Sequence, residues 1–155
     1  GPLLYNGLEY GERFEWPQLV HPKDGTLHKS VPREVQQIYR EAAIIKRNAP
    51  NAFAMMIRKG LEAICANRDA TGRTLAAKLK SLADRGEIPP ALAELTDALR
   101  TVGNTAAHDS LQNITAPMTW AIDDLFRAVV EYVYIAPAKL NEFNKSLHAF
   151  NGKDN

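Results

Sequence analysis

Apolar residues recur every three or four positions through most of this chain, and that spacing constrains the fold more than any other feature. It is clearest within 31–45, 53–64, 75–82, 92–102, 118–133 and 140–147. A period near 3.6 residues places such side chains on one face of an α-helix, whereas a half-buried strand would alternate. No segment alternates convincingly. The sequence therefore predicts an all-α fold, a bundle of five or six helices.

Proline, glycine and capping residues divide these helical segments, because each favours a helix end. The expected boundaries are Ser30 and Pro32 at the start of the first helix, Pro50 and Asn67 around the second, Leu75 and Gly86 around the third, Pro89-Pro90 before the fourth, Thr115 and Pro117 at the start of the fifth, and Pro137 before the sixth.

The segment before the first helix has neither helical nor alternating periodicity, and it is rich in glycine, proline and aromatic residues such as Trp16. This composition predicts an irregular N-terminal arm, residues 1–30, and we expect its aromatic side chains to dock on another surface. A helical domain over 31–150 and a polar tail over 151–155 complete the expected organisation.

A chain of 155 residues with 45% hydrophobic residues fits one globular domain with an ordinary core. Its formal net charge of +1 excludes a protein that coats nucleic acid through its overall field. A local cluster, Arg68, Arg73 and Lys78, lies around the third helix and predicts a nucleic-acid contact. Such a run is more often a solvated helix face, and nearby acidic residues dilute it.

Metal and cofactor sites are not expected. Cys65 is the only cysteine, and it stands in an apolar helical run. The four histidines, His21, His28, His108 and His148, are scattered without a metal-binding spacing, and no glycine-rich phosphate loop occurs. We also find no membrane-spanning run or signal peptide, which favours a cytoplasmic protein. The start at Gly1-Pro2, without methionine, suggests a processed or excised fragment of a longer protein.

The fifth predicted helix is apolar over a wider arc than a surface helix needs. We therefore expect it to lie either at the centre of the bundle or in the contact of a homodimer. In the second case Phe126, Val130 or their neighbours would lie near the dimer contact.

Arg100, Asn104 and His108 follow one another at steps of four residues. On one helix each such step drifts by only about 40°, so the three side chains would form a polar stripe. A guanidinium that binds phosphate beside an imidazole that titrates near neutral pH predicts a phosphodiester ligand or substrate. The alternative is structural, because Gly103-Asn104 is also a common helix stop, which would leave His108 in a turn.

Several short motifs occur together in a fixed order: Tyr39-Arg-Glu-Ala42, Arg58-Lys-Gly-Leu61-Glu62, Gly86-Glu-Ile88 and Arg100-Thr-Val-Gly103-Asn104-Thr-Ala-Ala107-His108. Over roughly 16–137 the chain resembles a prokaryotic family of unknown function that belongs to, or borders, the HEPN superfamily of helical domains. The resemblance implies a HEPN-like helical bundle and frequent homodimerisation. It also implies a domain that occurs alone or at the ends of restriction and other anti-phage defence proteins.

Active members of that superfamily are metal-independent ribonucleases, so the resemblance implies roles for the polar stripe. His108 would act as general acid or base, Arg100 would stabilise the phosphorane and Asn104 would orient the phosphate. In this chain Gly103 occupies the usual arginine position. Three hypotheses stay open: a dimerising defence domain that binds RNA or a partner protein, a ribonuclease, and a purely structural assembly module.

Overall fold

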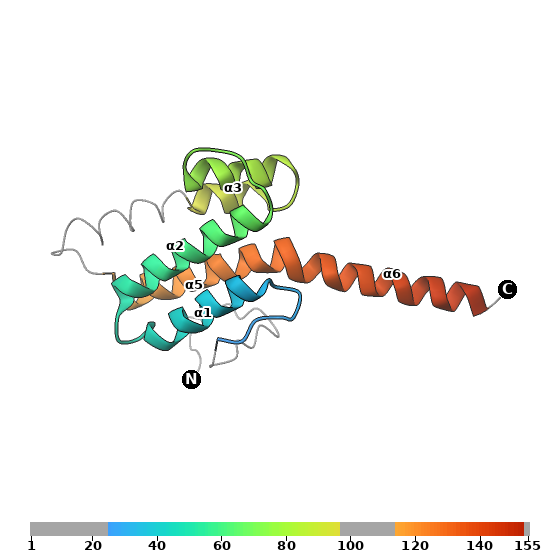
Figure 1. Ribbon diagram of the computed structural model, residues 1–155, viewed down its shortest axis with the longest axis horizontal. Helices are drawn as coiled ribbons and strands as arrows, with labels where there is room; N and C mark the ends of the chain where they lie inside the picture. Colours follow the sequence, from blue (N-terminus) through green and yellow to red (C-terminus); the bar gives the residue numbers. More distant parts are fainter. Residues whose placement is uncertain (1–24, 97–113, 154–155) are drawn as a thin grey trace, which may run out of the picture.

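The computed structural model describes residues 25–96 and 114–153, and within these ranges it contains helices and no strands. Residues 90–96 are also helical. The elements with defined bounds are α1 (Arg33–Ile45), α2 (Pro50–Asn67), α3 (Leu75–Asp84), α5 (Ala116–Val130), the π-helix η1 (Glu131–Ile135) and α6 (Ala136–Lys153) (Figure 1). The predicted all-α class is therefore confirmed.

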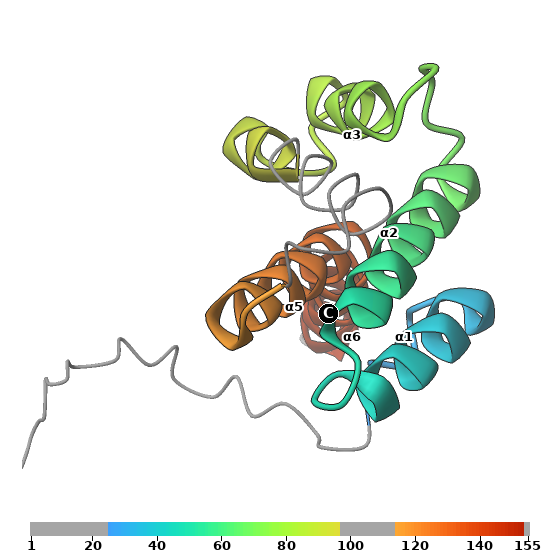
Figure 2. The same ribbon diagram turned by 90° about the vertical axis from the view of Figure 1, so that its left-hand side faces the viewer.

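Helix α2 is the centre of the bundle, because it contacts α1, α5 and α3. Figures 1 and 2 show α1 and α5 beside α2, with α3 across its far end. Its apolar residues recur at helical spacing and are almost completely buried; they include Phe53, Ile57, Leu61 and Ile64. The predicted apolar stripe of the second helix thus forms the middle of the core.

A stacked pair of rings joins α1 to α5 over the surface of α2. The rings of Tyr39 and Phe126 lie parallel with their centroids 5.2 Å apart, and both residues are at most 1% exposed. Gly60 of α2 faces the pair, and a Cβ at this position would lie 2.8 Å from Cε1 of Phe126. The missing side chain therefore allows α5 to approach α2 closely.

Helix α3 begins and ends with local capping interactions. The side chain of Thr74 accepts a hydrogen bond from the backbone N–H of Ala77. At the other end Gly86 adopts a φ of 78°, and the backbone N–H of Glu87 donates to the carbonyl of Leu82. This is the left-handed glycine termination that the Arg85-Gly86 pair predicts.

The fifth and sixth predicted helices form one continuous helical rod. Helix α5 passes through η1 into α6 without a break, and Val130 and Ala136 both keep right-handed helical dihedral angles. The expected interruption before Pro137 is therefore wrong. A proline ring inside a helix crowds the carbonyl four residues earlier, and the wider π turn directly before Pro137 relieves this crowding.

The ends of the helical region differ from the expected boundaries. Helix α1 begins after Pro32, which makes no side-chain capping hydrogen bond, while Ser30 pairs with Nδ1 of His28 instead. Leu27 belongs to the core, and α6 continues to Lys153. The helical unit thus includes the last residues of the expected arm and the first residues of the expected tail.

Of the two positions expected for the fifth helix, the structure shows the central one for Phe126 and Val130. Phe126 is 0% exposed and Val130 is 1% exposed in the single chain. The wide apolar arc of α5 is explained by its contacts with α2 and with the Tyr39 ring. It leaves no free surface at these two residues for a second copy.

We predict that Gly60→Ala destabilises the protein by about 1–2 kcal/mol, because overpacking against Phe126 exceeds the gain in helix propensity. Thermal or urea unfolding measures the change. Gly152→Ala is the matched control, since this helical glycine has no neighbouring atom within 4 Å of the added Cβ. Equal stability of the two variants would show that the Phe126 ring moves aside without lowering the free energy of unfolding.

Candidate functional site

Arg100, Asn104 and His108 lie outside the described residues. The phosphodiester site that they predict therefore stays a prediction, as does the alternative of a helix stop at Gly103. The basic residues around α3, Arg68, Arg73 and Lys78, do lie among the described residues.

The basic trio around α3 is divided by ion pairs. Nε of Arg68 donates to Oε1 of Glu87 at 2.8 Å, and Nζ of Lys78 donates to Oε1 of Glu62 at 3.0 Å. Arg73 is exposed, and no carboxylate in the described part of the chain pairs with it. Two of the three cations therefore already form an ion pair with a carboxylate of this protein.

No group of three His, Cys, Asp or Glu side chains among residues 25–96 and 114–153 is placed to hold a metal ion. None of the helices in these ranges is long and apolar enough to cross a membrane. Cys65 is buried, and burial is the main cause that raises the pKa of its thiol to about 11. The thiol is therefore protonated and enclosed at neutral pH.

The largest polar arrangement inside the bundle is the Asp123 cluster, made by Asp123, Tyr39, Lys46 and Arg127. The hydroxyl of Tyr39 donates to Oδ1 of Asp123, and Nζ of Lys46 donates to Oδ2 at 2.9 Å. Nε of Arg127 lies 3.6 Å from the same Oδ2. One buried carboxylate thus faces two cations and a phenol.

The chemistry of the Asp123 cluster is that of a structural brace. Both carboxylate oxygens have partners, and the guanidinium of Arg127 lies 4.9 Å from the centroid of the Tyr39 ring. Burial first, and then the charge of Asp123, raise the pKa of Tyr39, so its hydroxyl stays protonated and donates. Nε of Arg127 has no hydrogen-bond partner in the described structure, and the nearby carboxylate compensates its charge. The cluster ties α1 to α5.

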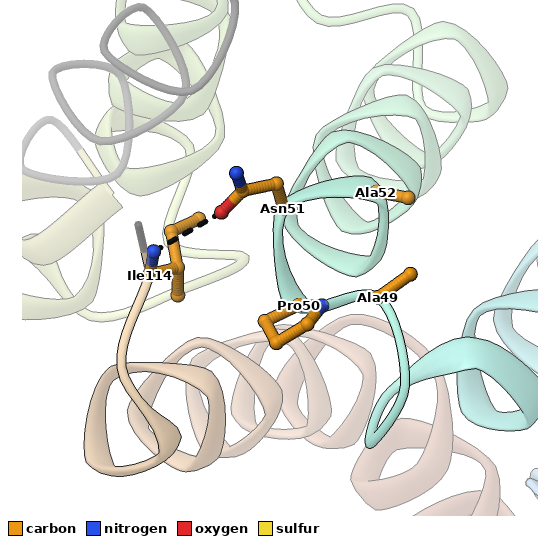
Figure 3. Close-up of a pocket in the computed structure, with 5 residues that line it drawn as sticks. All are labelled: Ala49, Pro50, Asn51, Ala52 and Ile114. Carbon is orange, nitrogen blue, oxygen red and sulfur yellow. Dashed lines mark hydrogen bonds between the residues drawn. The ribbon is translucent and has the colours of Figure 1, made fainter. Parts of the chain in front are cut away.

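A shallow hollow of about 500 Å³ lies at the start of α2 (Figure 3). Its walls are Ala49, Pro50, Ala52 and Ile114, with Asn51 as the polar member. Oδ1 of Asn51 accepts a hydrogen bond from the backbone N–H of Ile114 at 3.0 Å. The described lining offers no titratable group, so it supplies neither a general acid nor a general base.

The most exposed apolar surface lies on α6, which contacts only η1 among the elements with defined bounds. Figure 1 shows this helix extending from the bundle with no other labelled helix along its distal half. Its large apolar side chains are 44–64% exposed, and we call them the α6 face: Leu140, Phe143, Leu147 and Phe150. Their spacing of three, four and three residues places them on one side of the helix. The α6 face is the candidate functional surface.

Sequence reasoning only partly anticipated these features. It assigned Leu140, Phe143 and Leu147 to a sixth helix, but the spacing does not reveal that no other element of the described structure covers them. It missed Phe150 and the Asp123 cluster. The available signal for the cluster was an acidic residue, Asp123, at a position of the apolar stripe between Ile122 and Phe126.

A family model described as Domain of unknown function (DUF4145) matches residues 40–146, which is more than half of the chain. The matched range runs from within α1 to within α6 and so includes most of the bundle. No curated protein and no solved structure matches the chain.

We predict that Asp123→Ala lowers the free energy of unfolding by about 3–5 kcal/mol, because it leaves Arg127 and Lys46 without their carboxylate. Chemical denaturation followed by circular dichroism measures the loss. Asp124→Ala is the control on the same helix, since Asp124 is exposed and its removal changes stability by no more than about 0.5 kcal/mol. A small loss in both variants would contradict the role of the cluster as a brace.

Cys65 offers a second test of the core. With a pKa of about 11, only about one thiol in a thousand is ionised at pH 8, and the side chain is enclosed as well. We expect a thiol reagent to label the folded protein only as fast as the bundle opens, and to label it rapidly in denaturant. A variant that combines Cys65→Ala with Ala66→Cys, at the exposed neighbouring position, should react at once. Rapid labelling of native Cys65 would contradict the burial.

Proposed function

The chain belongs to the DUF4145 family, whose description names no function, and we propose that it is a HEPN-like helical domain that forms a homodimer. The single observation that carries this proposal is the α6 face. The helical bundle and the Arg100 to His108 motif support the HEPN affinity. The same resemblance places the domain in a prokaryotic defence protein, where the dimer would hold RNA or a partner protein.

The size of the α6 face supports an assembly role. Four large side chains that are 44–64% exposed present on the order of 400 Å² of surface, which is as large as the biggest apolar patch of a typical monomer. Pairing two such faces would bury roughly 800 Å², which is about half of a standard protein interface of about 1,600 Å². We therefore expect a dimer that dissociates on dilution rather than a permanent one.

The residues beside the α6 face favour a second copy as the occupant. Asn144 and Asn151 flank one side of the face, and Lys139 and Ser146 flank the other. When two α6 helices pair in a parallel arrangement, Lys139 meets Asn144 of the partner subunit. This arrangement places no like charge opposite Lys139, so the two α6 faces do not repel each other there.

The ribonuclease hypothesis depends on Arg100 and His108, and no described residue adds to it. An assembly domain is therefore the function that the described geometry supports best.

We predict that Phe143→Glu converts the dimer to a monomer, because it places a charge in the centre of the apolar contact between the two α6 faces. Sedimentation equilibrium of the full chain over a range of concentrations measures the change. Asn141→Glu is the matched control, since it adds the same charge at an exposed position of the same helix, about 160° around the axis from Phe143. The control should remain dimeric, and both variants should unfold at similar temperatures because Phe143 is exposed in the single chain.

Two results would contradict the proposal. An unmodified protein that stays monomeric at the highest concentration would exclude a second copy as the occupant. A monomer whose thermal stability falls sharply in the Phe143→Glu variant would show that the face packs within its own chain instead.

A further inference from the structure

Helix α1 carries a row of arginines on the side that faces away from the bundle. Arg33, Arg40 and Arg47 are spaced by seven residues and are exposed, and we call them the α1 arginine row. Seven residues are close to two helical turns, so the three side chains follow one line along the helix. The opposite side of α1 packs in the core through Val35, Ile38, Tyr39 and Ala42.

Arg47 lies just beyond the last residue of α1, but it continues the same line. Lys46 keeps right-handed helical dihedral angles, and the backbone N–H of Ala49 still donates to the carbonyl of Ile45 at 2.8 Å. The turn after α1 therefore retains the helical path over the whole row.

No arginine of the row pairs with a carboxylate in the part of the chain that the structure describes. The cations around α3 behave differently, since Arg68, Lys78 and Lys80 each have an acidic partner. The acids nearest to the row, Glu34 and Glu41, follow an arginine by one residue and so lie about 100° around the helix. Within the described structure, three guanidinium groups thus lie along one line without a carboxylate partner.

The dimensions of the row fit a polyphosphate backbone. Its arginines are about 10 Å apart along the axis, and the row is about 21 Å long, at 1.5 Å per residue. A duplex carries one phosphate charge for about every 1.7 Å of its axis, so a row of this length lies within reach of several phosphates. A guanidinium also binds phosphate with two parallel hydrogen bonds, which a solvated lysine does not provide.

We propose that the α1 arginine row binds the phosphate backbone of a nucleic-acid duplex without reading its sequence. A single strand would be held by stacking of its bases on aromatic rings, and the aromatic residue of α1, Tyr39, is buried. The large apolar side chain within the row is Ile44, which is 72% exposed and offers no ring for stacking. The row is separate from the α6 face, so this binding does not depend on dimerisation.

The test is the binding of a fluorescent 24-base-pair RNA duplex, and of the DNA duplex of the same sequence, to the full chain by anisotropy between about 50 and 200 mM salt. The triple variant Arg33→Gln, Arg40→Gln, Arg47→Gln should bind at least about tenfold more weakly at the lowest salt. The slope of the logarithm of its binding constant against the logarithm of salt concentration should be less steep by about two to three, since three phosphate contacts are lost. All three sites are exposed, so its unfolding temperature should not change.

The matched control removes three other exposed cations, through Lys59→Gln, Lys80→Gln and Lys145→Gln, and carries the same net charge. It should keep the original affinity and salt slope. Equal loss in both triple variants would overturn the proposal in favour of diffuse attraction. An unchanged duplex affinity in the α1 variant would also overturn it, and if that variant loses binding to poly-glutamate, the row serves an acidic protein instead.

Discussion

The carboxylate of Asp123 is the interaction on which the arrangement of the bundle depends. It is 4% exposed, and its partners come from α1 with its C-cap residue Lys46 and from α5 itself. Because a buried anion is tolerated only with compensating charge and hydrogen bonds, α1 and α5 must keep one relative position. The Tyr39–Phe126 stack and the close approach at Gly60 then follow in the same region. Packing and electrostatics therefore specify the same geometry.

Much of the fold follows from local sequence signals, and the remainder depends on contacts between residues that are far apart in the sequence. Pro50, Thr74, Gly86 and Thr115 act on their own turns, so the ends of α2, α3 and α5 can be predicted from neighbouring residues. Pro137 is a local signal for a helix boundary, but the helix continues through it because a π turn precedes it. The role of Asp123 cannot be read locally, since Tyr39 lies 84 residues away in sequence. The apolar arc at Phe126 and Val130 fits a core and a dimer equally well, and only the packing of α1 and α2 decides between them.

The described surface divides the charged and apolar groups between separate elements. The cations near α3 are largely neutralised within the protein, those of the α1 arginine row are not, and α6 presents uncovered apolar side chains. This division explains why composition is a poor guide to function in this chain. The net charge of +1 does not reveal the cationic α1 arginine row, and the overall hydrophobic fraction does not reveal the apolar α6 face.

The π turn of η1 also determines the direction in which the α6 face points. A π turn contains about one residue more than an α turn, and each residue advances a helix by about 100°. The extra residue within Glu131–Ile135 therefore rotates everything after it relative to the core that holds Phe126. Deletion of one residue there would restore a regular helix of nearly the same length while turning Leu140 and Phe143 to a different side. The π turn therefore sets the side of the domain on which the α6 face lies, independently of the residues that form the face.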